Sequence, residues 1–299
     1  MDGMTGDPQP IRPASTVMLL RDADAGLEVF TLRRAAGMAF AGGMTAFPGG
    51  GVDPSDDEPT IPWTGPAPEW WAGQWNIGPD QARRQVVAAV RELFEETGIL
   101  LAGPDADPVA TVGPATLDDS AVREDGRLAV AAHRASLADT LRRWDRPLRA
   151  DLLRPWARWI TPPGQTRRYD TYFFVAALPP GQRAAAVTSE AVAGGWQRPR
   201  AALDAERAGR IGMMPPTIAM LTDLAAASSV ADVLGTPRQV RPVTPVVLSR
   251  DGEVLRVRAD GREITARMSR RGRPALARDG VAPENSVTDE KPTTDEGAP

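Results

Sequence analysis

The chain has 299 residues, a formal net charge of −4, one histidine and no cysteine. The lack of cysteine excludes disulfides, thiolate metal sites and cysteine nucleophiles, and a weakly acidic chain is not expected to bind nucleic acid or anionic membranes. No run approaches the ~20 apolar residues of a membrane span, so we expect a soluble, cytoplasmic protein.

The N-terminal third predicts a hairpin, a glycine-rich loop and an insertion. Residues 1–11 are polar and predicted to be disordered, and the apolar runs 15–21 and 27–34 flank a turn, which is typical of an antiparallel hairpin. Residues 35–53 contain many glycines and are predicted to form a loop. The insertion at 51–80 is interpreted as a loop or a short helix pair. It carries four tryptophans, which either pack structurally, the commoner role, or cover an adenine or acyl group: Trp63, Trp70, Trp71 and Trp75.

The clearest helix is predicted over 81–97, with Asp80 as its N-cap and Gly98 ending it. Glu92, Glu95 and Glu96 stand at i, i+3 and i+4, so they share one face. Carboxylates held so close raise one another's pKa values unless a cation neutralises them. Oxygen-only ligation suits Mg²⁺ or Mn²⁺, so the pattern indicates metal-assisted chemistry on phosphate esters or anhydrides.

The remaining chain alternates helical and strand patterns. Residues 118–144 are predicted to be helical and include His133, which we interpret as an ordinary surface or semi-buried side chain because no Gly-x-Ser-x-Gly motif accompanies it. A strand is predicted over 169–177, helices over about 199–208 and 215–226, and two short strands within 240–257 around Asp251 and Gly252. Residues 269–299 have the composition of a disordered tail.

The stretch Arg-Glu-Leu-Phe-Glu-Glu-Thr-Gly-Ile at 91–99 resembles the second half of the Nudix box. The family pattern is a glycine, five residues, a glutamate, seven residues, then Arg-Glu-apolar-x-Glu-Glu-x-Gly-apolar. Gly50 lies 41 residues before Arg91 instead of 14, and Arg83 stands where counting back from Arg91 expects the glutamate. We interpret the box as split by an insertion of roughly 27 residues. Its first glutamate is missing or replaced by one of the acids of the insertion: Asp53, Asp56, Asp57 or Glu58.

The split box is similar to that of a Nudix subgroup resembling the peroxisomal acyl-coenzyme A diphosphatases. Segments 33–34, 158–162, 168–174 and 214–217 also resemble that subgroup. The resemblance spans about 12–225 and implies the Nudix α/β/α sandwich with a mixed central sheet and helical insertions. We expect a Nudix hydrolase domain over 12–235, with insertions at 51–80 and about 115–150, followed by a short β extension over 236–268.

The resemblance also implies roles for particular residues. Glu92, Glu95 and Glu96 are expected to hold Mg²⁺ or Mn²⁺, and Arg91 to pair with a box carboxylate and fix its rotamer. Glu190, outside the box, is the expected general base, with Glu95 as the alternative. The expected substrate-binding residues are the loop glycines and nearby arginines: Arg33, Arg34, Gly49, Gly50 and Arg168.

The implied activity is Mg²⁺-dependent hydrolysis of a phosphoanhydride in coenzyme A or acyl-coenzyme A, giving adenosine 3′,5′-bisphosphate and (acyl-)phosphopantetheine. Two alternatives stay open: a pyrophosphatase for a nucleotide sugar, dinucleotide or nucleoside triphosphate, and a non-catalytic Nudix module that senses a nucleotide. The expected partner is a small nucleoside diphosphate derivative, with no nucleic acid or membrane partner, and a homodimer is left open.

Overall fold

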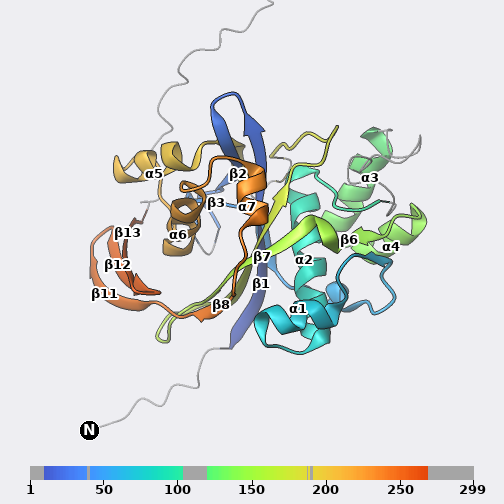
Figure 1. The fold of residues 1–299 in the computed structure, drawn as a ribbon, viewed down its shortest axis with the longest axis horizontal. Helices are drawn as coiled ribbons and strands as arrows, with labels where there is room; N and C mark the ends of the chain where they lie inside the picture. The colour runs from blue at the N-terminus through green and yellow to red at the C-terminus, as the bar shows by residue number, and fades with distance from the viewer. Residues whose placement is uncertain (1–9, 39–40, 104–119, 187, 189–190, 269–299) are drawn as a thin grey trace, which may run out of the picture.

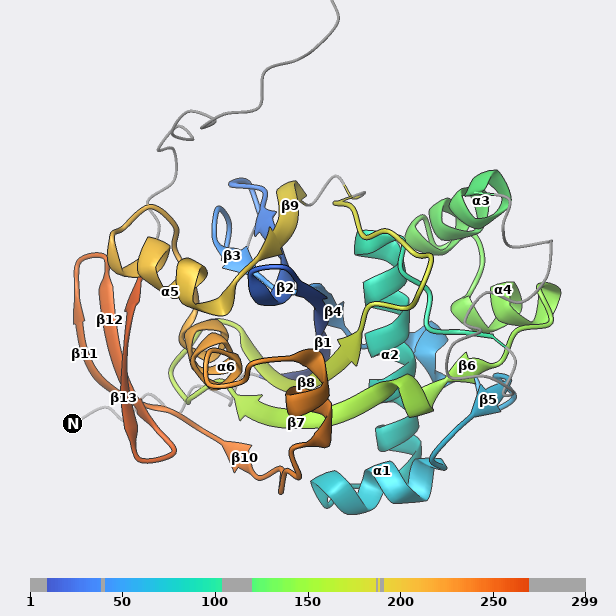
Figure 2. The same cartoon turned by 45° about the horizontal axis from the view of Figure 1, so that its top comes forward.

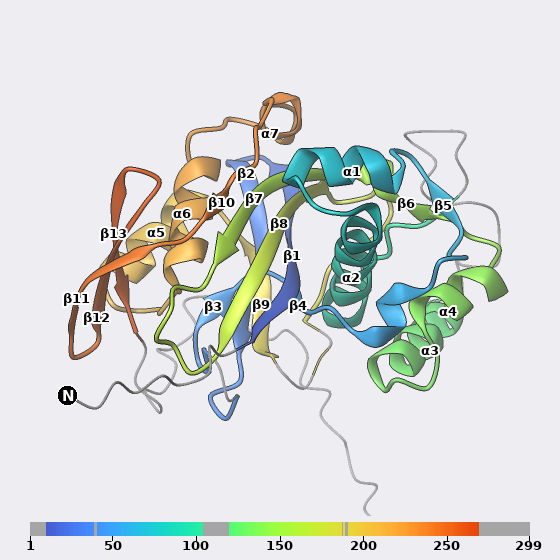
Figure 3. The same cartoon turned by 90° about the horizontal axis from the view of Figure 1, so that it is seen from below.

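The computed structural model describes residues 10–38, 41–103, 120–186, 188 and 191–268. They form three layers, with helices on both faces of a mixed sheet, as the sequence predicts (Figures 1 and 3). The sheet order is β10-β7-β8-β1-β2-β3, with β4 pairing to β1 and β9 to β2. The strands are β1 (Ile11–Ala23), β2 (Gly26–Arg34), β3 (Thr45–Ala46), β4 (Gly49–Gly51), β7 (Leu153–Ile160), β8 (Arg168–Ala177), β9 (Ala191–Gln197) and β10 (Pro242–Val243).

Strands β1 and β2 form the predicted antiparallel hairpin, and β1 also runs parallel to β8. Successive side chains of a strand point to opposite faces of its sheet. Accordingly, Val17 and Leu19 join one buried apolar cluster, whereas Met18 and Leu20 join the other. Both faces of β1 are therefore covered, which explains its continuous apolar run in place of an alternating pattern.

Helices form the two outer layers (Figure 3). On one side lie α1 (Pro68–Trp75), α2 (Pro79–Thr97), α3 (Ser120–Ala131) and α4 (Leu137–Arg143). On the other lie α5 (Pro199–Arg207) and α6 (Pro215–Leu224), and α7 (Val230–Gly235) follows them in the chain. The helical zone predicted at 118–144 is confirmed as two helices, separated where His133 adopts a φ of 52°. His133 is exposed, as expected for an ordinary surface histidine.

Helix α2 ends as predicted but begins two residues earlier than the N-cap assignment implied. Gly98 has a φ of 74°, and its N–H donates to the Phe94 carbonyl at 2.9 Å. The N-cap is Gly78, so the prediction of Asp80 was wrong. Pro79 takes the first helical position, where its fixed φ suits the helix and its missing N–H costs nothing.

The insertion contributes to the core. It contains a 3₁₀ turn, η1 (Pro54–Asp57), the short strand β5 (Trp63–Thr64), which pairs with β6 (Leu148–Arg149), and helix α1; a second 3₁₀ turn, η2 (Ala150–Leu152), follows β6. Trp71 and Trp75 are fully buried, with rings 5.8 and 5.3 Å from that of Phe174. These two tryptophans therefore have the structural role, whereas Trp70 is exposed.

The C-terminal part forms an antiparallel sheet of β11 (Val246–Asp251), β12 (Val254–Ala259) and β13 (Arg262–Arg267), beyond α5 and α6 (Figure 2). The first two strands were predicted; β13 was not. Val257 and Ile264 are buried in the same cluster as α6. Within the described ranges, no helix has both the length and the apolar character needed to cross a bilayer. The predicted disordered tail, 269–299, and residues 1–9 lie outside the described residues.

Candidate active site

The glycine run that was predicted as loop is strand β4, paired antiparallel to β1 with Gly50 opposite Ser15. Glycine has a low intrinsic preference for strands, so the local sequence did not indicate this pairing. The close approach requires glycine at two positions. A Cβ at Gly49 would lie 2.4 Å from the Ser15 carbonyl oxygen, and one at Gly50 would lie 2.5 Å from Oε1 of Glu92. Strand β4 therefore lies directly against the carboxylate face of α2.

The three box carboxylates are on that face of α2. The Gly49 N–H donates to Oε2 of Glu96 at 2.8 Å, and the Glu92 carboxylate lies against Gly50. Burial, with the neighbouring charge of Glu95, raises the pKa of Glu92 to about 7 against the opposing effect of Arg91. Glu92 and Glu95 together thus carry more negative charge than Arg91 alone neutralises.

Arg91 connects this face to the insertion. Its Nε and Nη2 donate to the two carboxylate oxygens of Asp56 at 2.8 and 3.0 Å, and both side chains are at most 5% exposed. Its Nη1 donates to Glu92 at 2.9 Å and to Glu95 at 3.2 Å, and Nη2 also donates to the Gly51 carbonyl at 2.8 Å. Burial raises the pKa of Asp56, although Arg91 opposes that effect. One guanidinium therefore fixes three carboxylates and the end of β4.

Asp56 is the acid of the insertion that reaches Arg91. The other three candidates have partners elsewhere: Asp53 caps η1, Asp57 pairs with Arg83 and Arg84, and Glu58 pairs with Arg142. The sequence contained the signal for Asp56, which stands six residues after Gly50, the spacing of glycine to glutamate in the Nudix pattern. Counting back from Arg91 missed it because the inserted residues follow the acid.

The residues fit a divalent cation by charge and by donor type. Asp56, Glu92 and Glu95 share one arginine, Arg91. Together with Glu96 they offer carboxylate oxygens, the hard donors that Mg²⁺ and Mn²⁺ prefer. Among the described residues, no three acidic or histidine side chains converge closely enough to enclose an ion. Arg91 holds Glu92 and Glu95, and the Gly49 N–H holds Glu96, so binding an ion would require these side chains to exchange partners.

The other predicted site residues are placed by the sheet. Arg33 and Arg34 end β2 and pair with β9, and the Nε atom of Arg34 is buried without a hydrogen-bond partner in the described structure. The Nε atom of Arg168 donates to the Thr161 carbonyl at 3.1 Å, which holds this side chain at the turn between β7 and β8. Glu190, the expected base, lies outside the described residues.

Two supporting contacts were not predicted. The Ser15 hydroxyl lies 2.8 Å from the Gln85 carbonyl oxygen and 2.7 Å from its side-chain oxygen, and so joins β1 to α2. Nη1 of Arg127 donates to the Glu95 carbonyl at 2.9 Å and joins α3 to the end of α2. Neither contact has a local sequence signal, because each joins residues 32 or more positions apart.

Comparison with known proteins agrees with this geometry. The family described as the NUDT19 Nudix domain matches residues 72–224. The acyl-coenzyme A diphosphatase NUDT19 of Gallus gallus is 31% identical over 160 residues, which cover 49% of this chain and 42% of that protein. The Homo sapiens protein of the same name is 27% identical over 249 residues, covering 70% of this chain and 63% of that one. The chain thus spans less than two thirds of either relative.

A solved structure shows the same fold. The crystal structure of a Nudix hydrolase from Alicyclobacillus acidocaldarius superposes with a TM-score of 0.58 at 30% sequence identity. The match covers 77% of this chain and 98% of that one. With the split box, the family match and this likeness, the chain belongs to the Nudix hydrolase family, in the branch described by the NUDT19 Nudix domain.

Proposed function

We propose that the chain hydrolyses a phosphoanhydride bond with the help of Mg²⁺ or Mn²⁺. The observation that carries this proposal is the cluster of Arg91 with Asp56, Glu92 and Glu95, buried beside β4. Glu92, Glu95 and Glu96 would hold the cation, which when bound neutralises phosphate charge and acidifies a water molecule.

The chain's own residues would align this chemistry. The pair of Arg91 and Asp56 fixes the direction from which Glu92 and Glu95 extend, a supporting role that keeps ligands in place. The Gly49 N–H orients Glu96, and Gly50 leaves room for the Glu92 carboxylate. We propose Glu190, in the segment that joins β8 to β9, as the base that takes the proton of the attacking water.

For the substrate we propose coenzyme A or acyl-coenzyme A, cut to adenosine 3′,5′-bisphosphate and (acyl-)phosphopantetheine. Support comes from the two relatives named acyl-coenzyme A diphosphatase and from the split box. The test is a panel of coenzyme A, acyl-coenzyme A, nucleotide sugars, dinucleotides and nucleoside triphosphates, each incubated with the purified chain and Mg²⁺ or Mn²⁺. Separation of the products identifies the bond that is cut.

The expected result is cleavage of coenzyme A or its thioesters that stops when a chelator removes the cation. Cleavage of another diphosphate, with acyl-coenzyme A left intact, would contradict the substrate but keep the reaction class. No hydrolysis of any member of the panel would contradict catalysis itself and leave nucleotide sensing as the function.

A further inference from the structure

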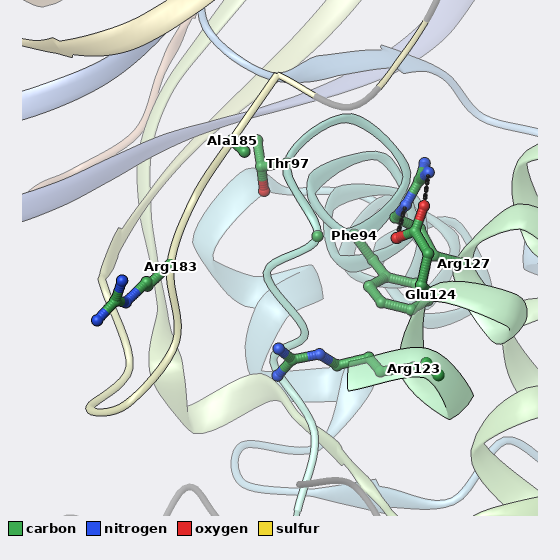
Figure 4. Close-up of a pocket in the computed structure, with 9 residues that line it drawn as sticks. Phe94, Thr97, Arg123, Glu124, Arg127, Arg183 and Ala185 are labelled. Carbon is green, nitrogen blue, oxygen red and sulfur yellow. Dashed lines mark hydrogen bonds and ion pairs between the residues drawn. The ribbon is translucent and has the colours of Figure 1, made fainter. Parts of the chain in front are cut away.

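A cavity of about 450 Å³ lies at the C-terminal end of α2, between α2, α3 and the chain that leaves β8 (Figure 4). Phe94, Thr97 and Gly98 supply the α2 side. Successive helical residues turn by about 100°, so Phe94 and Thr97 lie about 160° and 140° around α2 from Glu92. The cavity is therefore on a different side of α2 from the carboxylate cluster.

The lining is unusually basic for a chain with more acids than bases. Among the described residues, the lining contains three arginines and one acid, Glu124. That acid is bonded to Arg127, whose Nε and Nη2 both donate to the Glu124 carboxylate (Figure 4). Arg127 also donates to the Glu95 carbonyl and so fixes α3 against α2. This pair is committed to structure, and its charges cancel.

Arg123 and Arg183 carry the remaining charge. Within the described part of the chain, no carboxylate oxygen lies within 4.0 Å of either guanidinium group. In Figure 4, Arg123 extends from α3 beneath the end of α2, and Arg183 stands on the segment after β8, across the cavity. Two guanidinium groups that come from separate elements thus border one space, and the described residues of its lining carry a net positive charge.

The end of a helix normally disfavours an anion, because its last carbonyls carry partial negative charge. Here three carbonyls of the last turn already accept hydrogen bonds: that of Glu95 from Arg127, that of Phe94 from the Gly98 N–H, and that of Thr97 from the Ala185 N–H. The Thr97 hydroxyl donates to the Leu93 carbonyl. Among the described residues that line the cavity, Arg123 and Arg183 are the arginines whose guanidinium groups make no hydrogen bond within the protein.

We propose that this cavity is a second binding site, for a small organic molecule that carries a phosphate monoester. Guanidinium groups bind phosphate oxygens with paired, directional hydrogen bonds. The volume exceeds that needed by a free phosphate and falls within the range of small-molecule sites. The phosphate belongs either to a part of the hydrolysed substrate distant from the cleaved bond or to a separate molecule. The first possibility rests on the proposed function.

The direct test measures binding without catalysis. Calorimetric titration of the full chain in a chelator, with adenosine 3′-monophosphate as the probe and adenosine as the uncharged control, gives the dissociation constant. We expect the double variant Arg123→Gln/Arg183→Gln to weaken nucleotide binding about tenfold or more. Arg200→Gln removes an exposed arginine of α5, on the other face of the sheet, and should bind like the parent. Arg123→Lys/Arg183→Lys should recover part of the affinity.

The result that would overturn the site is equal affinity in the parent and the glutamine double variant, or no difference between nucleotide and adenosine in the parent. Thermal unfolding of both double variants checks that the fold is kept. Kinetics then assign the source of the phosphate. A KM that rises for coenzyme A but not for its dephospho form places a substrate phosphate in the site, whereas unchanged KM values with lost calorimetric binding indicate a separate ligand. If the chain hydrolyses no diphosphate, the calorimetric test of this binding site is still valid, because it measures binding without catalysis.

Discussion

Two arginine–aspartate pairs in this molecule have nearly the same geometry and different surroundings. Arg91 and Asp56 are joined by two hydrogen bonds of 2.8 and 3.0 Å, and Arg158 and Asp170 by two of 2.9 and 2.7 Å. The first pair joins the insertion to the middle of α2. The second lies on neighbouring strands, β7 and β8.

Their remaining contacts separate the two pairs. Arg158 lies 4.8 Å from the ring of Tyr172 and donates to the Trp75 carbonyl at 3.3 Å, so it connects α1 to the sheet. Arg91 instead donates to two further carboxylates, Glu92 and Glu95. The same pair of residue types therefore holds α1 against the sheet in one place and orients two further carboxylates in the other. This difference predicts that the two pairs affect activity and stability unequally.

The largest expected effect is on turnover. Glu95→Gln removes a charge of the carboxylate cluster while keeping its shape. We expect kcat for diphosphate hydrolysis with Mg²⁺ to fall by about 10²–10³-fold, the scale of losing one group that stabilises developing charge. The free energy of unfolding should be unchanged or raised, because one like charge leaves the cluster. Glu69→Gln, on the exposed side of α1, is the control. A Glu95→Gln enzyme with parental kcat would place the chemistry elsewhere.

Asp56→Asn should reduce both quantities. Removing the charge leaves Arg91 buried with fewer acceptors, and we expect a loss of about 3 kcal/mol in the free energy of unfolding. Arg91 would then shift toward Glu92 and Glu95 and change the orientation of their carboxylates. We therefore expect kcat/KM to fall about 10–100-fold. Urea unfolding and steady-state kinetics measure the two effects. Asp57→Asn, at the neighbouring exposed acid, should change neither greatly, and equal effects of the two substitutions would contradict the assignment of Asp56.

Gly50→Ala tests whether the position of the Glu92 carboxylate affects activity more than it affects stability. The new Cβ would meet the flexible end of Glu92, so we expect that carboxylate to move and activity to fall about tenfold. Stability should change by less than about 1.5 kcal/mol, since the neighbour can shift. Gly51→Ala is the matched control, because its Cβ would come no closer than 4.0 Å to the Pro13 carbonyl oxygen. Comparable losses in both variants would show that the strand, and not the Glu92 contact, is at fault.

Asp170→Asn should have the smallest effect on catalysis. It weakens the pairing with Arg158, and we expect about 2 kcal/mol less free energy of unfolding. Activity of the folded protein should stay within about twofold of the parent, because the contacts of this pair run to Tyr172 and Trp75. A loss of kcat as large as that of Asp56→Asn would remove the distinction between the two pairs.

The local pattern of the chain was enough to predict much of this arrangement. The spacing of Val86, Val90 and Leu93 indicated α2, and Gly98 marked its end. The spacing of Glu92, Glu95 and Glu96 placed them on one face. Helical and strand periodicities report which side of an element is buried, and this information is contained in neighbouring residues.

What the tertiary structure decided are the contacts between distant segments. Strand β4 was not predicted, because its glycines are typical of a loop. In the folded chain they let the backbone lie close to β1 and Glu92. Asp56 had the right spacing from Gly50, but only the folded chain distinguishes it from the three other acids, because only there is it buried against Arg91. The sequence by itself determined the helix, the acids and the family resemblance. Which acid reaches the arginine depends on how the insertion returns to α2, and that path is set by the burial of Trp71 and Trp75 in the core.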